Sequence, residues 1–347
     1  MKRLKDISWL VNEATYRADK DLSYSNLSTY NREGFSKLDS LFEEISGPGL
    51  TFGNMVDTLL TEGIDLYNNK FAVAEFPVLT ESRLAVVEEV FAKHSKTYSK
   101  LEDIPAPLIL NTINELEFQT NWKDDTRVNN IIKNGVEYYA LKYQTRGKEI
   151  VTEEDHQDAV KCVDKLKNST TTGWFFTPEP FDDTIDREFQ LKFKGQYKGI
   201  GIRCMADLII VDHKNKTIIP CDLKTSYYPE WEFPRSFIKW NYYIQAQMYW
   251  YIIRQNLDKD PYFKDFKLSN FIFIVISRNT LTPLVWEYPD TKVEVDCYYG
   301  KNKDILCRNW RGILEELNYY LTNNPDIPLG IHKNKTNNIT TILNESL

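Results

Sequence analysis

The stretch ADLIIVDHKNKTIIPCDLKTS, residues 206–226, decides the fold, because it predicts two short adjacent strands joined by the polar turn VDHKNK. Side chains alternate along a strand, so Asp222 and Lys224 point to one face and Leu223 points to the opposite face. The turn brings Asp207 back beside Asp222. Two carboxylates and one lysine at this spacing can hold a divalent metal and a water next to a phosphate.

Composition narrows the class of protein. The chain of 347 residues has 42% hydrophobic residues, enough for a sizeable core in one elaborated α/β domain or in two domains. A net charge of −7 argues against a surface that binds nucleic acid everywhere, although a local basic groove is compatible with it. The five cysteines lack the pair spacing of a zinc or disulfide framework, so we expect reduced thiols. No signal peptide or membrane span is evident, and we expect a cytoplasmic protein with no membrane partner.

The hydrophobic period changes along the chain. Residues 1–180 show mostly helical spacing, except that 70–77 could form an edge strand. The period of two begins near 187. The elements expected after that point are a meander of three or four strands over 187–226, a long amphipathic helix over 236–257, strands at 270–278 and 283–289, and a helix within 292–321. The polar tail from 334 is expected to be partly disordered.

The helix that follows the two strands adds to the pattern. Its Gln245 and Tyr249 are four residues apart and share one face. An Asp-x-Lys triplet alone is common on solvated strand ends, but here Asp207 precedes it by one hairpin length. The order of a strand Asp, a strand Asp-x-Lys and a helix Gln-x-x-x-Tyr resembles the PD-(D/E)XK nuclease superfamily, in its RecB-like and lambda-exonuclease-like (RecE-like) branch.

Upstream segments extend the resemblance over roughly residues 22–290. LSYSNLSTY at 22–30 looks like the first, serine-containing helix of that branch, and TFGNMVDTLLTEG at 51–63 looks like its second helix. Many relatives carry a metal-contacting histidine in this second helix, where this chain has Asp57. The departure leaves a hard oxygen ligand suited to Mg²⁺ or Mn²⁺ but puts the metal preference in doubt.

The resemblance implies a restriction-endonuclease-like core, a central mixed β-sheet flanked by helices, with a helical N-terminal half. It predicts one integrated domain with a helical region at 1–180, the nuclease core at 181–290 and a C-terminal helix and tail at 291–347. It also implies a metal-dependent DNA exonuclease that uses Mg²⁺ or Mn²⁺. The residues implied as metal ligands are Asp57, Asp207, Asp222, the main-chain carbonyl of Leu223 and, as an additional acid, Glu188. An exposed strand-end glutamate is an equal alternative for the last of these.

The resemblance also assigns roles to other side chains. Lys224 would orient or deprotonate the attacking water, Gln245 would bond that water or the phosphate, and Tyr249 would line the same wall; core packing is the alternative for the last two. The candidate DNA phosphate contacts are Arg203, Lys192, Lys194 and Lys198, with a solvated sheet face as the alternative for the three lysines. Some relatives hold an iron-sulfur cluster, but this chain lacks the required cysteines, so we expect none.

Three functions remain open. The leading expectation is an exonuclease acting on DNA ends in recombination, repair or replication in a phage or prophage, alongside a single-strand annealing protein. An endonuclease of the same fold is the second. A nuclease-like module that binds DNA or protein without cutting is the third, although Asp207, Asp222 and Lys224 are all present. Relatives often form rings, so a homo-oligomer is expected. The four histidines are dispersed, and His213 in the turn is expected to be exposed.

Overall fold

The structure is a computed structural model, and its chain forms two compact units. The sheet unit comprises Met1–Thr61 and Lys161–Leu347, and the helical unit comprises Glu62–Val160. Both boundaries fall within the region expected to be the helical N-terminal half. The structure describes the chain except for residues 44–46, 178–182, 324–330, 334–339 and 343–347. Most of the polar tail expected to be disordered therefore lies outside the described residues. Among the residues that are described, no helix is long and apolar enough to cross a membrane.

A mixed six-stranded sheet forms the centre of the sheet unit. Its main order is β3-β4-β5-β7-β8, with β6 beside β5. The strands are β3 (Ile185–Tyr197), β4 (Ile200–Asp212), β5 (Thr217–Ser226), β6 (Lys267–Leu268), β7 (Phe271–Ser277) and β8 (Leu284–Tyr288). The first three form an antiparallel meander, β5 and β7 are parallel, and β7 and β8 are antiparallel. The predicted meander thus has three strands, and the predicted α/β fold, a mixed sheet flanked by helices, is confirmed.

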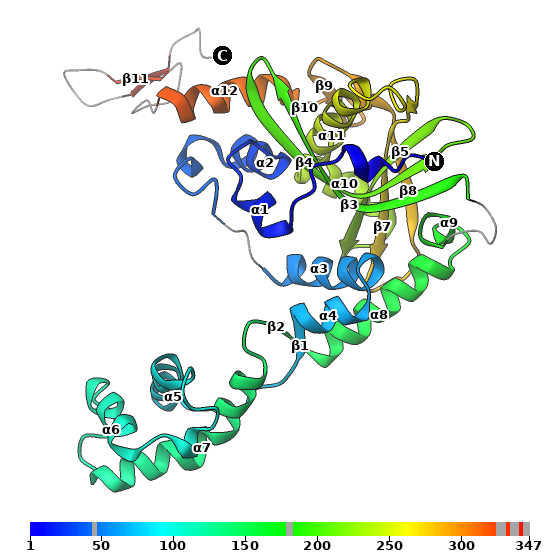
Figure 1. Ribbon diagram of the computed structural model, residues 1–347. Coiled ribbons are helices and arrows are strands. Elements are labelled where there is room, and N and C mark those ends of the chain that lie inside the picture. Colours follow the sequence, from blue (N-terminus) through cyan, green and yellow to red (C-terminus); the bar gives the residue numbers. More distant parts are fainter. Residues whose placement is uncertain (44–46, 178–182, 324–330, 334–339, 343–347) are drawn as a thin grey trace. The chain divides into compact units, whose positions relative to one another are not determined.

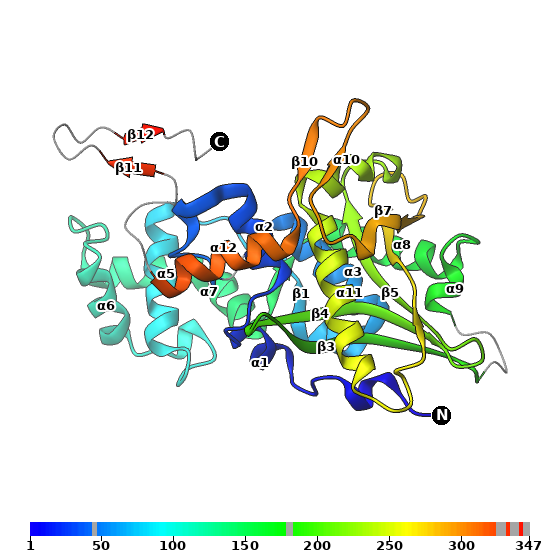
Figure 2. The same cartoon turned by 90° about the horizontal axis from the view of Figure 1, so that it is seen from above.

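Helices cover both faces of this sheet. Helix α11 (Tyr242–Asp258) runs along one face over β3 and β4, and α3 (Pro48–Thr61) lies on the opposite face against β5 (Figures 1 and 2). The other helices of this unit are α1 (Glu13–Ala18), α2 (Tyr24–Glu33), α9 (Gly173–Phe176), α10 (Phe233–Lys239) and α12 (Trp310–Asn323), and α8 (Glu153–Asn168) crosses the boundary between the units. The short elements are η1 (Leu4–Ile7), η2 (Gly34–Lys37), η4 (Glu230–Glu232), η5 (Pro289–Lys292) and the hairpins β9 (Cys297–Tyr299) with β10 (Ile305–Cys307) and β11 (Ile331–Lys333) with β12 (Thr340–Ile342).

The single long helix predicted over 236–257 is two helices, α10 and α11. Between them Asn241 has φ 56°, in the left-handed region that asparagine tolerates better than most residues. Its side chain donates to the main-chain oxygen of Ser28 in α2 at 3.4 Å and accepts from the hydroxyl of Tyr243 at 3.2 Å. The break therefore has a tertiary cause, which the helical spacing alone does not reveal.

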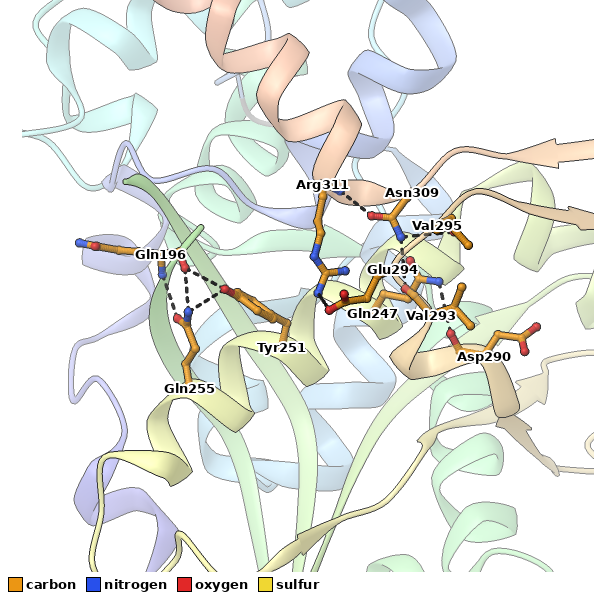
Figure 3. Close-up of polar contacts among 10 residues, drawn as sticks. All are labelled: Gln196, Gln247, Tyr251, Gln255, Asp290, Val293, Glu294, Val295, Asn309 and Arg311. Atoms are coloured by element: carbon orange, nitrogen blue, oxygen red, sulfur yellow. Dashed lines mark hydrogen bonds and ion pairs between the residues drawn. The ribbon is translucent and has the colours of Figure 1, made fainter. Parts of the chain in front are cut away.

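Side chains on the outer face of α11 form hydrogen bonds and packing contacts with the C-terminal part of the sheet unit (Figure 3). Gln247 donates to the main-chain oxygen of Asp290 at 3.3 Å, as Figure 3 shows. It also donates to the hydroxyl of Tyr288 at 3.1 Å. Arg311, in the first turn of α12, forms an ion pair with Glu294 at 2.9 Å. The indole of the preceding residue, Trp310, is fully buried against α11. These contacts hold α11 in place from the side that faces away from the sheet.

The helical unit has its own core. It contains α4 (Ile64–Lys70), α5 (Glu81–His94), η3 (Leu101–Asp103), α6 (Ala106–Glu115), α7 (Asp124–Gln144) and the first residues of α8, with the strands β1 (Phe71–Val73) and β2 (Glu149–Val151). The two strands pair in parallel, which confirms the strand expected at 70–77. Apolar side chains of α5, α6 and α7 pack together and are buried, among them Val87, Ile109 and Ile131.

A close approach of helices in this unit gives the first prediction. A Cβ atom at Gly135 of α7 would lie 2.6 Å from Cγ2 of Val87, a stiff β-branched side chain of α5. We expect Gly135→Ala to lower the free energy of unfolding by about 1–3 kcal/mol, because overpacking outweighs the helix preference of alanine. The control is Gly312→Ala in α12, where a Cβ meets no atom within 4 Å, and we expect it to raise stability by up to ~1 kcal/mol. Urea denaturation followed by circular dichroism measures both, and equal gains would contradict the close packing.

Candidate active site

The predicted carboxylates lie where the sheet forks. The β4–β5 ladder runs from the pair Asp212–Thr217 to the pair Leu208–Cys221 and stops there. The next pair in this register is Asp207 with Asp222. From this point β5 continues beside β7, whereas β4 continues beside β3. The two aspartates therefore occupy the first positions at which the neighbouring strands separate.

Side chains and a distant segment take over the hydrogen bonds that the fork leaves open. The carboxylate of Asp207 accepts from the main-chain N–H of Leu223 at 2.9 Å. Further along β4, Leu22 bridges in parallel to Ile202 and fills the edge that β5 has left. Buried N–H and C=O groups need partners, so these contacts stabilise the separation of the strands.

Asp222 is the most deeply buried of the site carboxylates, with 2% of its surface exposed. Its Oδ2 pairs with Nζ of Lys224 at 2.6 Å, which confirms that the two side chains share one face of β5. Its Oδ1 accepts from the side-chain amide of Gln245 in α11. A carboxylate only accepts, so this bond fixes the orientation of the Gln245 amide. The Gln245 carbonyl oxygen is buried and has no hydrogen-bond partner among the described residues.

Helix α3 brings Asp57 to the site from the opposite face of the sheet. A Cβ at Gly53 would lie 3.2 Å from Oγ1 of Thr225, so the helix lies close against β5 one turn before Asp57. The carboxylate of Asp57 accepts from the side-chain amide of Gln190 at 2.8 Å. Gln190 has φ 52°, and the β3–β4 ladder skips the Gln190–Asp207 pair while keeping the same register on both sides. Strained backbone of this kind often occurs at functional sites.

Asp57, Asp207 and Asp222 all lie beside one small cavity of about 10 Å³, but the surface that this cavity exposes is apolar. The other lining side chains are mainly apolar, and the complete lining is Asp57, Leu60, Thr61, Phe176, Phe189, Asp207, Leu208, Cys221, Asp222, Leu223 and Ile274. A larger cavity of about 220 Å³ lies on the outer face of α11, but none of the predicted site residues lines it.

Electrostatics at the fork follow from burial and like charge. Burial of the Asp207 carboxylate, together with the charges of Asp222 and Asp57, raises its pKa well above the ordinary value. Burial alone would lower the pKa of Lys224, but the charge of Asp222 and the neighbouring tyrosines and Asp207 outweigh it, so the pKa is raised. Lys224 is therefore an ammonium ion at neutral pH and acts here as a positive charge.

The donor set fits a small divalent cation. Asp57, Asp207 and Asp222 carry hard oxygen atoms of the kind that Mg²⁺ prefers, and a cation would relieve the charge repulsion that, after burial, raises the pKa of Asp207. In the part of the chain that the structure describes, no three His, Cys, Asp or Glu side chains are already grouped as a metal site. The carboxylates instead hold the hydrogen bonds to Gln190, Leu223 and Gln245 described above.

Two residues predicted for the site do not line the cavity. Tyr249 is buried with its ring against Phe271, and burial, with smaller contributions that include the charges of Asp222 and Asp207, raises the pKa of its hydroxyl, so Tyr249 lies within reach of both charges. Glu188 is buried and pairs with Arg3 at 2.6 Å, so this acid is satisfied by the N-terminal segment. The nearby residue that reaches the site is Gln190, because its left-handed backbone changes the direction of its side chain.

The basic residues predicted to contact DNA phosphates form contacts within the chain, mostly with acidic side chains. Arg203 is buried, donates to the main-chain oxygen of Asp21 at 2.9 Å and lies over the ring of Tyr16, so it is not placed to meet DNA. Lys194 pairs with Asp19 at 2.6 Å. The remaining lysines also have contacts within the chain: Lys198 pairs with Glu315 at 2.8 Å, and Lys192 donates to the Gln190 main-chain oxygen at 3.4 Å. Lys192 and Lys194 share one face of β3 as predicted, but Lys198 lies in the turn after β3 with φ 50°, so strand parity does not apply to it.

Two tyrosines beside Lys224 were missed. The Lys224 ammonium lies 4.3 Å from the ring centre of Tyr242, and its charge also acts on Tyr24. Tyr24 lies in the segment 22–30 and donates to the main-chain oxygen of Trp240 at 2.6 Å. The resemblance of that segment was the only available signal. The expectation that His213 is exposed was wrong, because its ring is buried and lies 3.0 Å from a carboxylate oxygen of Asp186.

Comparisons with known proteins add little to this geometry. No family model matches the chain, and no curated protein matches it. Among solved structures, the chain is similar to a candidate exonuclease from Eubacterium rectale, with a TM-score of 0.41 and 12% sequence identity over 91% of this chain and 85% of that chain. The interpretation of the site therefore rests on its own residues.

Proposed function

We propose that the chain is a metal-dependent DNA exonuclease of the PD-(D/E)XK type, acting at the fork between β4 and β5. One observation carries the proposal: Asp207 and Asp222 occupy the first unpaired register position of these strands, and Lys224 and Gln245 converge on Asp222. Two carboxylates with an adjacent ammonium ion suit phosphodiester hydrolysis, whereas a purely structural role would not require them to be drawn together in a buried place.

The residues have separable roles in this proposal. Asp57, Asp207 and Asp222 would hold Mg²⁺ or Mn²⁺, with the main-chain carbonyl of Leu223 as a further ligand. The bound ion would supply a Lewis acid and lower the pKa of its water. Lys224, already charged and held by Asp222, would stabilise negative charge on the phosphate. The free carbonyl oxygen of Gln245 would accept a hydrogen bond from the attacking water.

The decisive assay uses the purified full chain with end-labelled linear duplex DNA and a covalently closed circle of the same sequence. We expect Mg²⁺ or Mn²⁺ to support loss of the linear DNA while the circle stays intact, and we expect EDTA to stop the reaction. Cutting of the circle would show an endonuclease instead. Binding of DNA without cleavage of either substrate, with both metals, would contradict the proposal and favour a module that does not cut.

A further inference from the structure

The loop that follows the catalytic strand presents three aromatic side chains to solvent. Tyr227, Tyr228 and Trp231 are 50%, 61% and 59% exposed, and the first of them comes three residues after Lys224. We call these three residues the aromatic platform. Large aromatic side chains usually bury their surface, so three exposed ones within five residues indicate a surface that meets a partner.

A buried carboxylate holds this loop in place. Glu230 lies between the platform residues and is fully buried. It accepts from the main-chain N–H groups of Ser277 at 3.0 Å and Thr282 at 2.9 Å, and from the hydroxyls of Thr280 and Thr282. Four hydrogen bonds to the connection between β7 and β8 offset the cost of burying this charge. The exposed rings are therefore carried on an anchored loop, which lowers the entropy lost when a partner binds.

One residue of the platform, Tyr227, is linked to the elements of the candidate active site. The guanidinium of Arg278 lies 5.0 Å from the ring centre of Tyr227 and 4.5 Å from that of Phe52 in α3. It also donates to the hydroxyl of Tyr227 at 2.8 Å. Phe52 lies on the helix that carries Asp57, and its neighbour Gly53 contacts β5 at Thr225. Arg278 therefore links the platform to the elements that form the fork.

Charge at this surface favours an anionic partner. The exposed Arg235 follows the loop in α10 and pairs with Glu232 at 2.9 Å, and Lys239 lies at the end of the same helix. Arg278 contacts Tyr227 directly, and Arg235 and Lys239 lie on the helix that follows the loop, although the whole chain carries a net charge of −7. Aromatic rings beside cations are the usual means of binding unpaired nucleotides, because every base has a face that stacks.

We propose that the aromatic platform binds the unpaired nucleotides of a single-stranded DNA end and delivers that end to the fork. The inference rests on the proposed function, and it names single-stranded ends as the form of substrate that the site accepts. Stacking of bases on Tyr228 and Trp231, the two most exposed rings, would supply most of the preference over a blunt duplex.

The test measures binding without cleavage. A fluorescein-labelled oligothymidylate and a blunt duplex of the same length are titrated with the full chain in EDTA, and anisotropy is recorded. We expect Tyr228→Ala and Trp231→Ala each to weaken single-strand binding roughly 5- to 100-fold, with little change for the duplex. Tyr228→Phe and Trp231→Phe should restore most of the affinity, because phenylalanine keeps a face that stacks. The matched control is Tyr298→Ala in β9, which removes a ring that is 58% exposed and should change nothing.

The outcomes separate this inference from the proposed function. Alanine variants that bind the single strand as the unmodified chain does would overturn the inference, even if the protein cleaves DNA. A change in self-association in sedimentation, without a change in single-strand binding, would also overturn it, because the rings would then form an interface between copies. If the alanine variants lose single-strand binding but the unmodified protein cuts no DNA, the platform is supported and only the nuclease proposal is contradicted.

Discussion

Asp222→Asn is expected to lower metal-dependent DNA cleavage by at least about 100-fold, the scale of loss for a group that stabilises charge in a reaction. Asparagine keeps the shape of the side chain but removes the charge that holds Lys224 at 2.6 Å and that would bind a cation. Lys224→Gln should lower cleavage by a similar factor, because it removes the positive charge of the same ion pair. Initial rates on end-labelled linear DNA measure both effects.

The control for this experiment lies on the same pair of strands. Asp212→Asn changes an aspartate at the other end of the β4–β5 ladder, where the carboxylate accepts from the main chain of Asn215 at 2.8 Å. We expect its cleavage rate to stay within a few-fold of that of the unmodified chain. Removing one partner of a buried ion pair is destabilising, so thermal unfolding followed by circular dichroism must show that Asp222→Asn is still folded. Folded Asp222→Asn protein with undiminished cleavage would rule out the fork as the active site.

Asp207→Asn is expected to stabilise the metal-free protein, by about 0.5–2 kcal/mol in the free energy of unfolding, while it removes activity. The pKa of Asp207 is raised by burial and by the charges of Asp222 and Asp57, so its ionised form costs folding energy at neutral pH. Asparagine has no such charge, and its carbonyl can still accept from Leu223. Urea denaturation in EDTA measures the difference between the two proteins.

The stability gained by Asp207→Asn should depend on pH, and the direction of the change can be stated. Because the folded state raises the pKa of Asp207, the folded protein holds its proton more tightly than the unfolded chain does. The stability of the metal-free protein should therefore fall as pH rises above the ordinary aspartate pKa of about 4. The advantage of Asp207→Asn should be small at that pH and grow toward neutrality.

Adding Mg²⁺ or Mn²⁺ should make the unmodified chain more stable than the Asp207→Asn variant. A cation that binds the folded state alone stabilises the unmodified chain in proportion to the logarithm of its concentration, whereas the variant lacks one ligand. Asp258→Asn, at an exposed ion pair with Arg254, is the matched control and should respond to metal as the unmodified chain does. If metal changed the stability of none of these proteins, the carboxylates would not form a cation site.

The sequence predicts the local part of the site well. Period-two alternation placed Asp222 and Lys224 on one face of β5, and the ion pair between them confirms it. Helical spacing placed Gln245 on a helix, and its contact with Asp222 joins β5 to α11 across η4 and α10. These predictions depend on residues within a few tens of positions, where secondary structure largely determines which side chains meet.

Contacts between distant segments account for what the sequence did not reveal. Glu188 and Arg203 obey the parity of their strands, but the N-terminal segment supplies Arg3 and Asp21 to them. Nothing in the pattern of β3 indicates that Gln190 adopts a left-handed backbone and reaches Asp57. Such contacts depend on how α3 and the first residues pack against the sheet.

The hydrogen bond from the Leu223 amide to Asp207 makes the fork observable by spectroscopy. The β4–β5 ladder, which ends at the pair Leu208–Cys221, joins the two strands through backbone groups, which do not titrate. This amide instead points at an ionisable group, so its NMR chemical shift should follow the charge on that carboxylate. A single backbone resonance at Leu223 would therefore report proton loss and cation arrival at the fork in the absence of any DNA.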